Sequence, residues 1–297
     1  MGKDINNDNS FMIRFRSSII LMAVAITAMV FGKYVLFAVI ALITMIGLME
    51  LYRVVGVNKS KAGTVGYGIA ALYFLYQAFT NFIMPEINIG DFMQHTVLFN
   101  IWTNALLIII ALLLILVLAV YVLTFPKYNS EQITMVVFGF FYIVMPLMYI
   151  FQTRQLSGGE YAVWLIFIGS WGSDTMAYVV GRKIGKTKIA PKLSPKKSLE
   201  GLIGGIVGAA LIGVIFAIIF KSQLEESFSN PILLFGLTGA IGSVVSQIGD
   251  MAASAIKRNK GIKDYGTLIP GHGGILDRFD SVIFIAPIVY FMITVFA

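Results

Sequence analysis

The sequence predicts an all-α, polytopic integral membrane protein with about nine transmembrane helices. Of its 297 residues, 58% are apolar and only 12% are charged, whereas soluble domains carry about 25% charged residues. Several apolar stretches approach or exceed the roughly 20 residues that cross a bilayer as a helix. They are too long and too continuously apolar for the strands of a membrane barrel.

The predicted spans follow one another along the whole chain. They lie near residues 16–32, 34–53, 64–84, 102–125, 132–152, 160–181, 201–221, 231–256 and 279–297. Only Gly32 and Lys33 separate the first two, so we expect a tight helical hairpin or a partly re-entrant pair. We divide the chain into N-terminal transmembrane helices (1–160) and a C-terminal catalytic region (161–297) with cytoplasmic loops at 182–200 and 257–280.

Lys and Arg are distributed unevenly between the two predicted sides of the membrane. With nine spans and a cytoplasmic N-terminus, 19 of the 22 Lys and Arg residues fall in cytoplasmic segments, and only Lys33, Arg154 and Lys221 fall opposite. Because cytoplasmic loops are enriched in Lys and Arg, this predicts a multi-pass protein of the cell membrane with its N-terminus and both long loops in the cytoplasm. The net charge of +7 has the same explanation, so we expect no nucleic-acid partner. The lack of cysteine excludes thiolate catalysis and Cys-ligated metals.

Two aspartates, Asp174 and Asp250, lie near the predicted cytoplasmic ends of apolar helices. A carboxylate is costly in such a position, so it usually faces a partner or a water-filled cavity. Ser243, Gln247, Asp250 and Ser254 recur at helical spacing and therefore share one helix face. That face is either the wall of a site or a structural polar stripe between helices.

The loop from Ser254 to Asp280 carries the strongest sign of chemistry. It combines cations with a Gly-His-Gly-Gly run that two aspartates follow, namely Lys257, Arg258, Lys260, Lys263, Gly271, His272, Gly273, Gly274, Asp277, Arg278 and Asp280. The cations suit phosphate groups, glycines let the backbone approach a ligand closely, and a histidine can donate to phosphate or exchange a proton. Carboxylates without thiolates suit Mg²⁺, which shares the phosphate oxygens of a substrate.

A second basic loop, Gly181–Gly201, holds seven cations. These cations could simply anchor the loop at anionic lipid headgroups. Lys196 and Lys197 lie beside Ser194 and Ser198, however, and this arrangement indicates a phosphate-binding turn. The chain has no GxxxxGK[ST] run, so an ordinary P-loop NTPase is not supported.

These loops resemble the phosphatidate cytidylyltransferase family, also called CDP-diacylglycerol synthases. The family signature is filled without a gap by Ser254, Ile256, Lys257, Arg258, Lys263, Asp264, Gly266, Ile269, Pro270, His272, Gly273, Gly274, Ile275, Asp277, Arg278, Phe279 and Asp280. The run SPKKSLEG that begins at Ser194 is similar to the family's SPKK[T/S]xEG loop, and the segment from Asp174 to Arg182 is similar as well. The resemblance covers roughly residues 165–285.

The resemblance implies an enzyme that condenses CTP with phosphatidic acid, giving CDP-diacylglycerol and pyrophosphate. It implies that Asp250 and Asp277 hold Mg²⁺, and a second cation stays open. His272 and Lys257 are the further expected catalytic residues, with His272 orienting or protonating a phosphate oxygen. The residues expected to bind CTP and the lipid phosphate are Ser194, Lys196, Lys197, Ser198, Arg258, Lys263 and Arg278. Membrane lipid is an expected partner, and a homodimer is left open.

Three other classes of protein were weighed against this interpretation. A transporter or channel would also have many spans and intramembrane aspartates, but the sequence has no obvious internal repeat. Another CTP-using lipid enzyme, such as a polyprenol kinase or a synthase acting on ether lipids, would share the nucleotide, and the kinase would release CDP in place of pyrophosphate. A CDP-alcohol phosphotransferase should carry a DGxxAR…GxxxDxxxD run, which this chain lacks.

Overall fold

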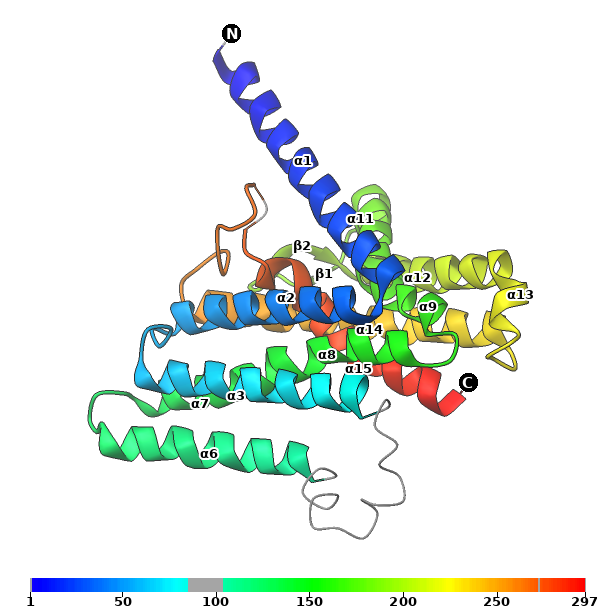
Figure 1. Ribbon diagram of the computed structural model, residues 1–297. Helices are drawn as coiled ribbons and strands as arrows, with labels where there is room; N and C mark the ends of the chain where they lie inside the picture. Colours follow the sequence, from blue (N-terminus) through cyan, green and yellow to red (C-terminus); the bar gives the residue numbers. More distant parts are fainter. Residues whose placement is uncertain (1, 85–103, 272, 297) are drawn as a thin grey trace. The chain divides into compact units, whose positions relative to one another are not determined.

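The computed structural model describes residues 2–84, 104–271 and 273–296, and most of them are helical (Figure 1). The elements in chain order are α1 (Gly2–Phe31), α2 (Lys33–Val54), α3 (Lys61–Ala78), η1 (Phe79–Ile83), α6 (Ala105–Leu123), α7 (Ser130–Gly139), η2 (Phe140–Val144), α8 (Met145–Gln155), α9 (Gly159–Ala162), α10 (Trp164–Phe167), η3 (Ile168–Gly172), α11 (Ser173–Ile184), β1 (Lys188–Ala190), β2 (Ser194–Ser198), α12 (Leu199–Ile219), α13 (Lys221–Leu224), α14 (Pro231–Asn259) and α15 (Leu276–Phe296). The elements labelled η are single π-helical turns.

Seven helical segments of the described chain are long and apolar enough to cross a membrane. They are Lys33–Val54, Ala105–Leu123, Ser130–Gln155, Gly159–Ile184, Leu199–Ile219, Pro231–Asn259 and Leu276–Phe296. The all-α, polytopic class is therefore confirmed, whereas the count of nine is not. The other two predicted spans correspond to α1, whose apolar part is only Ile19–Phe31, and to α3 with η1.

The described residues form two compact units. The first joins Met1–Gly47 to Met145–Ala297, and the second is Leu48–Val144. Both basic loops belong to the first unit. The predicted start of the catalytic region near residue 160 stays a prediction.

The second unit is a small helical bundle in which α3 packs on α6 and α7. Its centre includes the buried Tyr52, whose hydroxyl donates to the carbonyl oxygen of Val136 at 2.8 Å. Gly66 lies directly against the Tyr52 ring, with no room for a larger side chain.

In the first unit, α12 packs against α11 and α14, α14 packs against α15, and α15 packs against α8 (Figure 1). Glycines make the α12–α14 contact possible. A side chain at Gly213 would collide with the backbone of Phe235, and one at Gly239 would collide with the backbone of Ala209. Small residues of this kind let helices approach closely in lipid. Glycines of α12 and α14 therefore serve helix packing.

The junction of α1 and α2 consists of Gly32, which adopts a φ of +55° that favours glycine. Arg154 holds the end of α1, because its Nε donates to the carbonyl oxygen of Met29 at 3.2 Å. The two helices diverge from this junction (Figure 1). The prediction of a tight hairpin is therefore wrong, because α1 and α2 enclose a cavity between them instead of packing along their lengths.

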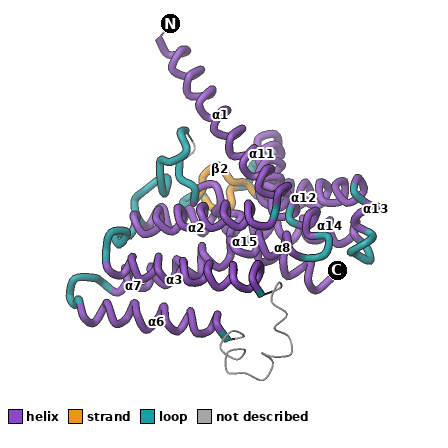
Figure 2. Tube along the Cα trace, in the orientation of Figure 1, coloured by secondary structure: helices purple, strands orange, loops and turns teal. Residues whose placement is uncertain are grey.

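The loop between α11 and α12 contains the two short strands of the described chain (Figure 2). β1 and β2 pair antiparallel, with Lys188 opposite Ser198 and Ala190 opposite Ser194. Ser198 then caps α12, since its hydroxyl accepts from Gly201 N at 3.2 Å. The Glu200 carboxylate accepts from the backbone of Lys186 and Thr187. The hairpin is therefore fixed to the start of α12.

Candidate functional site

Helix α14 carries Asp250, which forms an ion pair with Lys197 of β2. Lys197 Nζ lies 2.6 Å from Asp250 Oδ2, and the two side chains are 21% and 29% exposed. The contact joins residues 53 positions apart in the sequence. It brings the second basic loop onto the polar end of α14, as the prediction of a shared site requires.

Three aspartates interact at this end of the first unit. The Asp280 carboxylate, on α15, interacts electrostatically with Asp250 and with Asp174 of α11. Asp174 also interacts with Asp250 and with the cations Lys197 and Arg278. Like charges that share a small region repel one another, so this carboxylate cluster (Asp174, Asp250 and Asp280) favours nearby positive charge.

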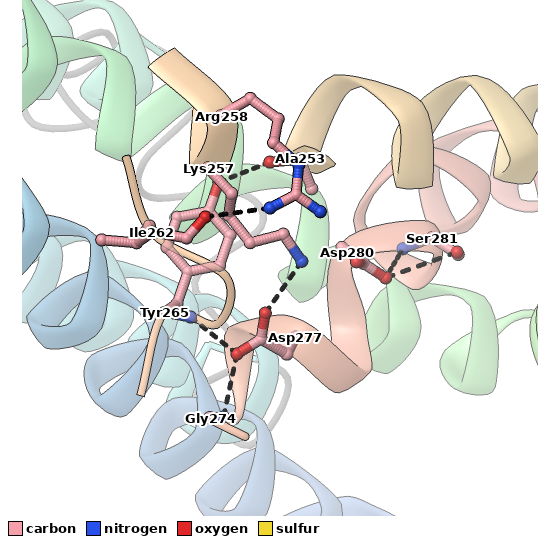
Figure 3. Close-up of polar contacts among 9 residues, drawn as sticks. All are labelled: Ala253, Lys257, Arg258, Ile262, Tyr265, Gly274, Asp277, Asp280 and Ser281. Atoms are coloured by element: carbon pink, nitrogen blue, oxygen red, sulfur yellow. Dashed lines mark hydrogen bonds and ion pairs between the residues drawn. The ribbon is translucent and has the colours of Figure 1, made fainter. Parts of the chain in front are cut away.

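Asp277 has a different environment from the cluster. Its side chain is 1% exposed, and Oδ1 accepts from Lys257 Nζ at 2.9 Å. Oδ2 accepts from Tyr265 N at 2.8 Å and from Gly274 N at 2.9 Å (Figure 3). Both oxygens therefore have donors already, and Asp277 ties the loop after α14 to the first turn of α15.

The same loop packs around this carboxylate. Tyr265 donates its hydroxyl to the carbonyl oxygen of Ala253 at 3.2 Å, and its ring lies 5.4 Å from Lys257 Nζ. Gly273 has a φ of +87°, and a side chain there would come within 2.9 Å of Asp277 Oδ2. The glycines that the sequence suggested for ligand contact thus allow the backbone to approach Asp277.

A basic cavity of about 430 Å³ opens between α11, β2 and α12. Its cations are Arg182, Lys188, Lys196 and Lys197. Asp174 is the one acidic residue in its described lining. The cavity is therefore suited to a polyanion such as a nucleoside triphosphate.

An apolar cavity of about 460 Å³ lies between α1, α2 and the start of α15. Its walls are largely aliphatic: Leu21, Met22, Val24 and Ala25 from α1, and Val39, Leu42, Ile43 and Ile46 from α2. Its other end is polar and includes Asp174, Arg278 and Asp280. Asp174 thus lines both cavities and Asp280 lines the apolar one, whereas Asp250 lines neither and is linked to the basic cavity through its ion pair with Lys197.

The structure places the sequence-predicted residues in several environments. Lys196, Lys197 and Ser198 line the basic cavity, and Asp277 and Arg278 line the apolar one. Five others line neither cavity, namely Ser194, Asp250, Lys257, Arg258 and Lys263. Arg258 Nη1 instead donates to the carbonyl oxygen of Ile262 at 3.3 Å and so closes the turn after α14. His272 lies outside the described residues.

The predicted polar stripe on α14 divides along its length. Ser243 is buried and its hydroxyl is 2.6 Å from that of Ser173, whereas Gln247 lines the basic cavity. The stripe is therefore structural at Ser243, reaches the basic cavity at Gln247, and meets Lys197 at Asp250. The sequence singled out Asp174 and Asp280 but did not place them beside Asp250. Acidic residues are rare at the ends of the apolar helices of this chain, and this could have grouped the three.

The fold and the site define a polytopic membrane protein in which a basic and an apolar cavity share one lining residue, Asp174. The chain belongs to the cytidylyltransferase family, whose model matches residues 12–296. It is 31% identical over 192 residues to the phosphatidate cytidylyltransferase of Bacillus subtilis, covering 63% of this chain and 68% of that protein. The enzyme of the same name from Staphylococcus haemolyticus is 30% identical over 276 residues, covering 93% of this chain and 96% of that protein.

Proposed function

We propose that this protein transfers CMP from CTP to phosphatidic acid, giving CDP-diacylglycerol and pyrophosphate for phospholipid synthesis. The observation that carries the proposal is the meeting of a basic cavity and an apolar cavity at Asp174. A reaction between a nucleotide and a lipid needs both environments side by side. Family membership and the named relatives support the same reaction.

The basic cavity receives CTP in this proposal. Lys188, Lys196 and Lys197 offset the negative charge of the triphosphate, and Lys197 also reaches the carboxylate cluster. The lipid lies in the apolar cavity, with its acyl chains against α1 and α2. Arg278 is the cation in the described lining of this cavity, so it binds the lipid phosphate.

The chemistry then needs positioning and charge stabilisation more than a strong base. A phosphate oxygen of the lipid attacks the α-phosphorus of CTP. The bond from that phosphorus to the oxygen that bridges to the β-phosphate breaks, and pyrophosphate leaves with the electron pair. Lys197 and its neighbours hold the triphosphate in place and stabilise the charge that develops on the leaving pyrophosphate.

The carboxylates of the site suit Mg²⁺ by composition, because oxygen ligands are those it prefers. When bound, the cation would neutralise phosphate charge and activate the pyrophosphate for departure. Within the described residues, no three His, Asp or Glu side chains are already arranged as a metal site. Asp250 remains the first expected ligand, with Asp280 and Asp174 beside it. Asp277 could serve as a second ligand only if the cation displaced Lys257 from its carboxylate.

The proposal places the N-terminus and both basic loops in the cytoplasm, where CTP is available, and places the chain in the cell membrane. The charge asymmetry of the loops supports this orientation. Residues of one chain line both cavities, and a homodimer stays open.

A coupled assay of pyrophosphate release tests the function. Purified protein in detergent micelles receives CTP, phosphatidic acid and Mg²⁺, and release should require all three. A lipid kinase would release CDP without pyrophosphate, and a transporter would release neither. Asp250→Asn should abolish release while the protein still inserts into membranes; near-normal rates in this variant would remove Asp250 from the site.

A further inference from the structure

We propose that Lys197 pairs with the Asp250 carboxylate as long as no cation is bound there. When the cation binds to Asp250, Lys197 leaves it and pairs with the nucleotide phosphates. Nucleotide binding and cation binding are then coupled through the exchange of one ion pair. The inference rests on the proposed function, since it takes the basic cavity as the phosphate site and Asp250 as a cation ligand.

The Lys197–Asp250 contact has the features of an exchangeable pair. Nζ and Oδ2 are 2.6 Å apart, and both side chains are partly exposed. Lys197 Nζ itself is buried and makes no hydrogen bond of normal geometry with the described residues. An ammonium group has three donors, so most of its hydrogen-bonding capacity is unused. A phosphate oxygen in the adjoining cavity would satisfy these donors.

The position of the pair links the two halves of the site. Lys197 lines the basic cavity, and Asp250 interacts with the neighbouring Asp280 and Asp174. If a phosphate draws Lys197 away, Asp250 is left among like charges and its affinity for a divalent cation rises. A cation on Asp250 has the reciprocal effect, because it frees Lys197 for phosphate.

The second Lys–Asp pair, Lys257–Asp277, lacks these features. Lys257 is 12% and Asp277 1% exposed at the side chain, and a hydrogen bond joins them. Asp277 Oδ2 is held by two backbone nitrogens, and Lys257 lies over the Tyr265 ring. This pair is fixed in the fold, so only the Lys197–Asp250 pair is placed to exchange.

Nucleotide-free Mn²⁺ binding to the full-length protein in detergent, measured by electron paramagnetic resonance, tests the exchange. Lys197→Gln is compared with Lys196→Gln. Both variants remove one positive charge from β2 and from the basic cavity, but Lys196 has no ion pair with a described residue. Lys197→Gln should bind Mn²⁺ about five-fold more tightly than Lys196→Gln, because Asp250 has lost its competitor. Equal affinities, or weaker binding by Lys197→Gln, would overturn the proposal.

A reciprocal measurement uses CTP binding in EDTA. Asp250→Asn frees Lys197 and should bind CTP several-fold more tightly than Asp280→Asn, which removes a carboxyl group of the cluster that forms no ion pair with Lys197. Equal CTP affinities would overturn the exchange. Pyrophosphate release by the wild-type protein is measured separately, so a failed assay of function is distinguished from a failed exchange.

Discussion

Lys257 and Asp277 form a buried ion pair that joins the end of α14 to the first turn of α15. Nζ lies 2.9 Å from Oδ1, and the other carboxylate oxygen holds two backbone nitrogens of the intervening loop. Figure 3 shows the loop wrapped around this carboxylate. Asp277 therefore organises the loop whether or not it also meets a cation.

Asp277→Asn should destabilise the protein as well as abolish Mg²⁺-dependent turnover. The change removes the carboxylate that is paired with the buried Lys257 ammonium, and breaking a buried pair typically costs about 3–5 kcal/mol. Thermal unfolding followed by tryptophan fluorescence should show a clear fall in Tm. Asp250→Asn should lose turnover with a Tm close to wild type, because Asp250 is more exposed.

The Lys257→Met, Asp277→Asn double variant is the control for this interpretation. It removes the unpaired charge and should recover part of the lost stability without recovering turnover. A Tm as low as that of Asp277→Asn alone would show that the ion pair is not what stabilises the loop.

Gly273→Ala should also disturb the loop. Gly273 has a positive φ, and an added methyl group would press on Asp277 Oδ2 at 2.9 Å. Gly261→Ala is the matched control, because Gly261 has a φ of +66° with no atom within 4 Å of the added carbon. We expect Gly273→Ala to lower Tm by more than Gly261→Ala and to reduce turnover at least ten-fold. Equal losses would mean that backbone strain alone is responsible.

The sequence predicted several helices closely, because their signal is local. The predicted span 201–221 became Leu199–Ile219, and 231–256 became Pro231–Asn259. Ser198 and the Asn230–Pro231 pair mark these starts by ordinary capping. The β1–β2 hairpin was not predicted, because its lysines, serines and prolines give no strand pattern. The divergence of α1 from α2 could not be predicted, because it depends on contacts between distant residues, such as that of Arg154 with Met29.

The site was predicted by residue type and less well by role. The charges of Lys197, Asp250 and Asp277 were recognised, but their pairing depends on how α12, α14 and α15 pack. The two backbone donors to Asp277 could not be predicted, since they come from a loop without periodicity. Ser198 is predicted to bind phosphate. In the structure its hydroxyl accepts a hydrogen bond from Gly201 N and caps α12.

Arg278 and Lys196 should affect different substrates, because they line different cavities. Arg278→Gln should raise the KM for phosphatidic acid about ten-fold or more and change that for CTP little. Lys196→Gln should do the reverse. Initial rates in mixed micelles, with each substrate varied in turn, give the four constants. Parallel changes in both KM values would contradict the assignment of the two cavities.

Narrowing the apolar cavity should change which lipids are used. Ala25 lines this cavity, so Ala25→Phe should lower kcat/KM for long-chain phosphatidic acid more than for short-chain forms. Ala23→Phe is the control, since Ala23 lies on the same helix, is exposed and does not line the cavity. If both variants behave alike, the acyl chains do not lie between α1 and α2.

We propose that a divalent cation binds at Asp250, beside Asp174 and Asp280. Anomalous scattering from crystals grown with Mn²⁺ and CTP locates the ion directly. The account predicts a peak within coordination distance of Asp250, with Lys197 moved onto the triphosphate. A peak remote from Asp250, or one that leaves the Lys197–Asp250 pair intact, would contradict it.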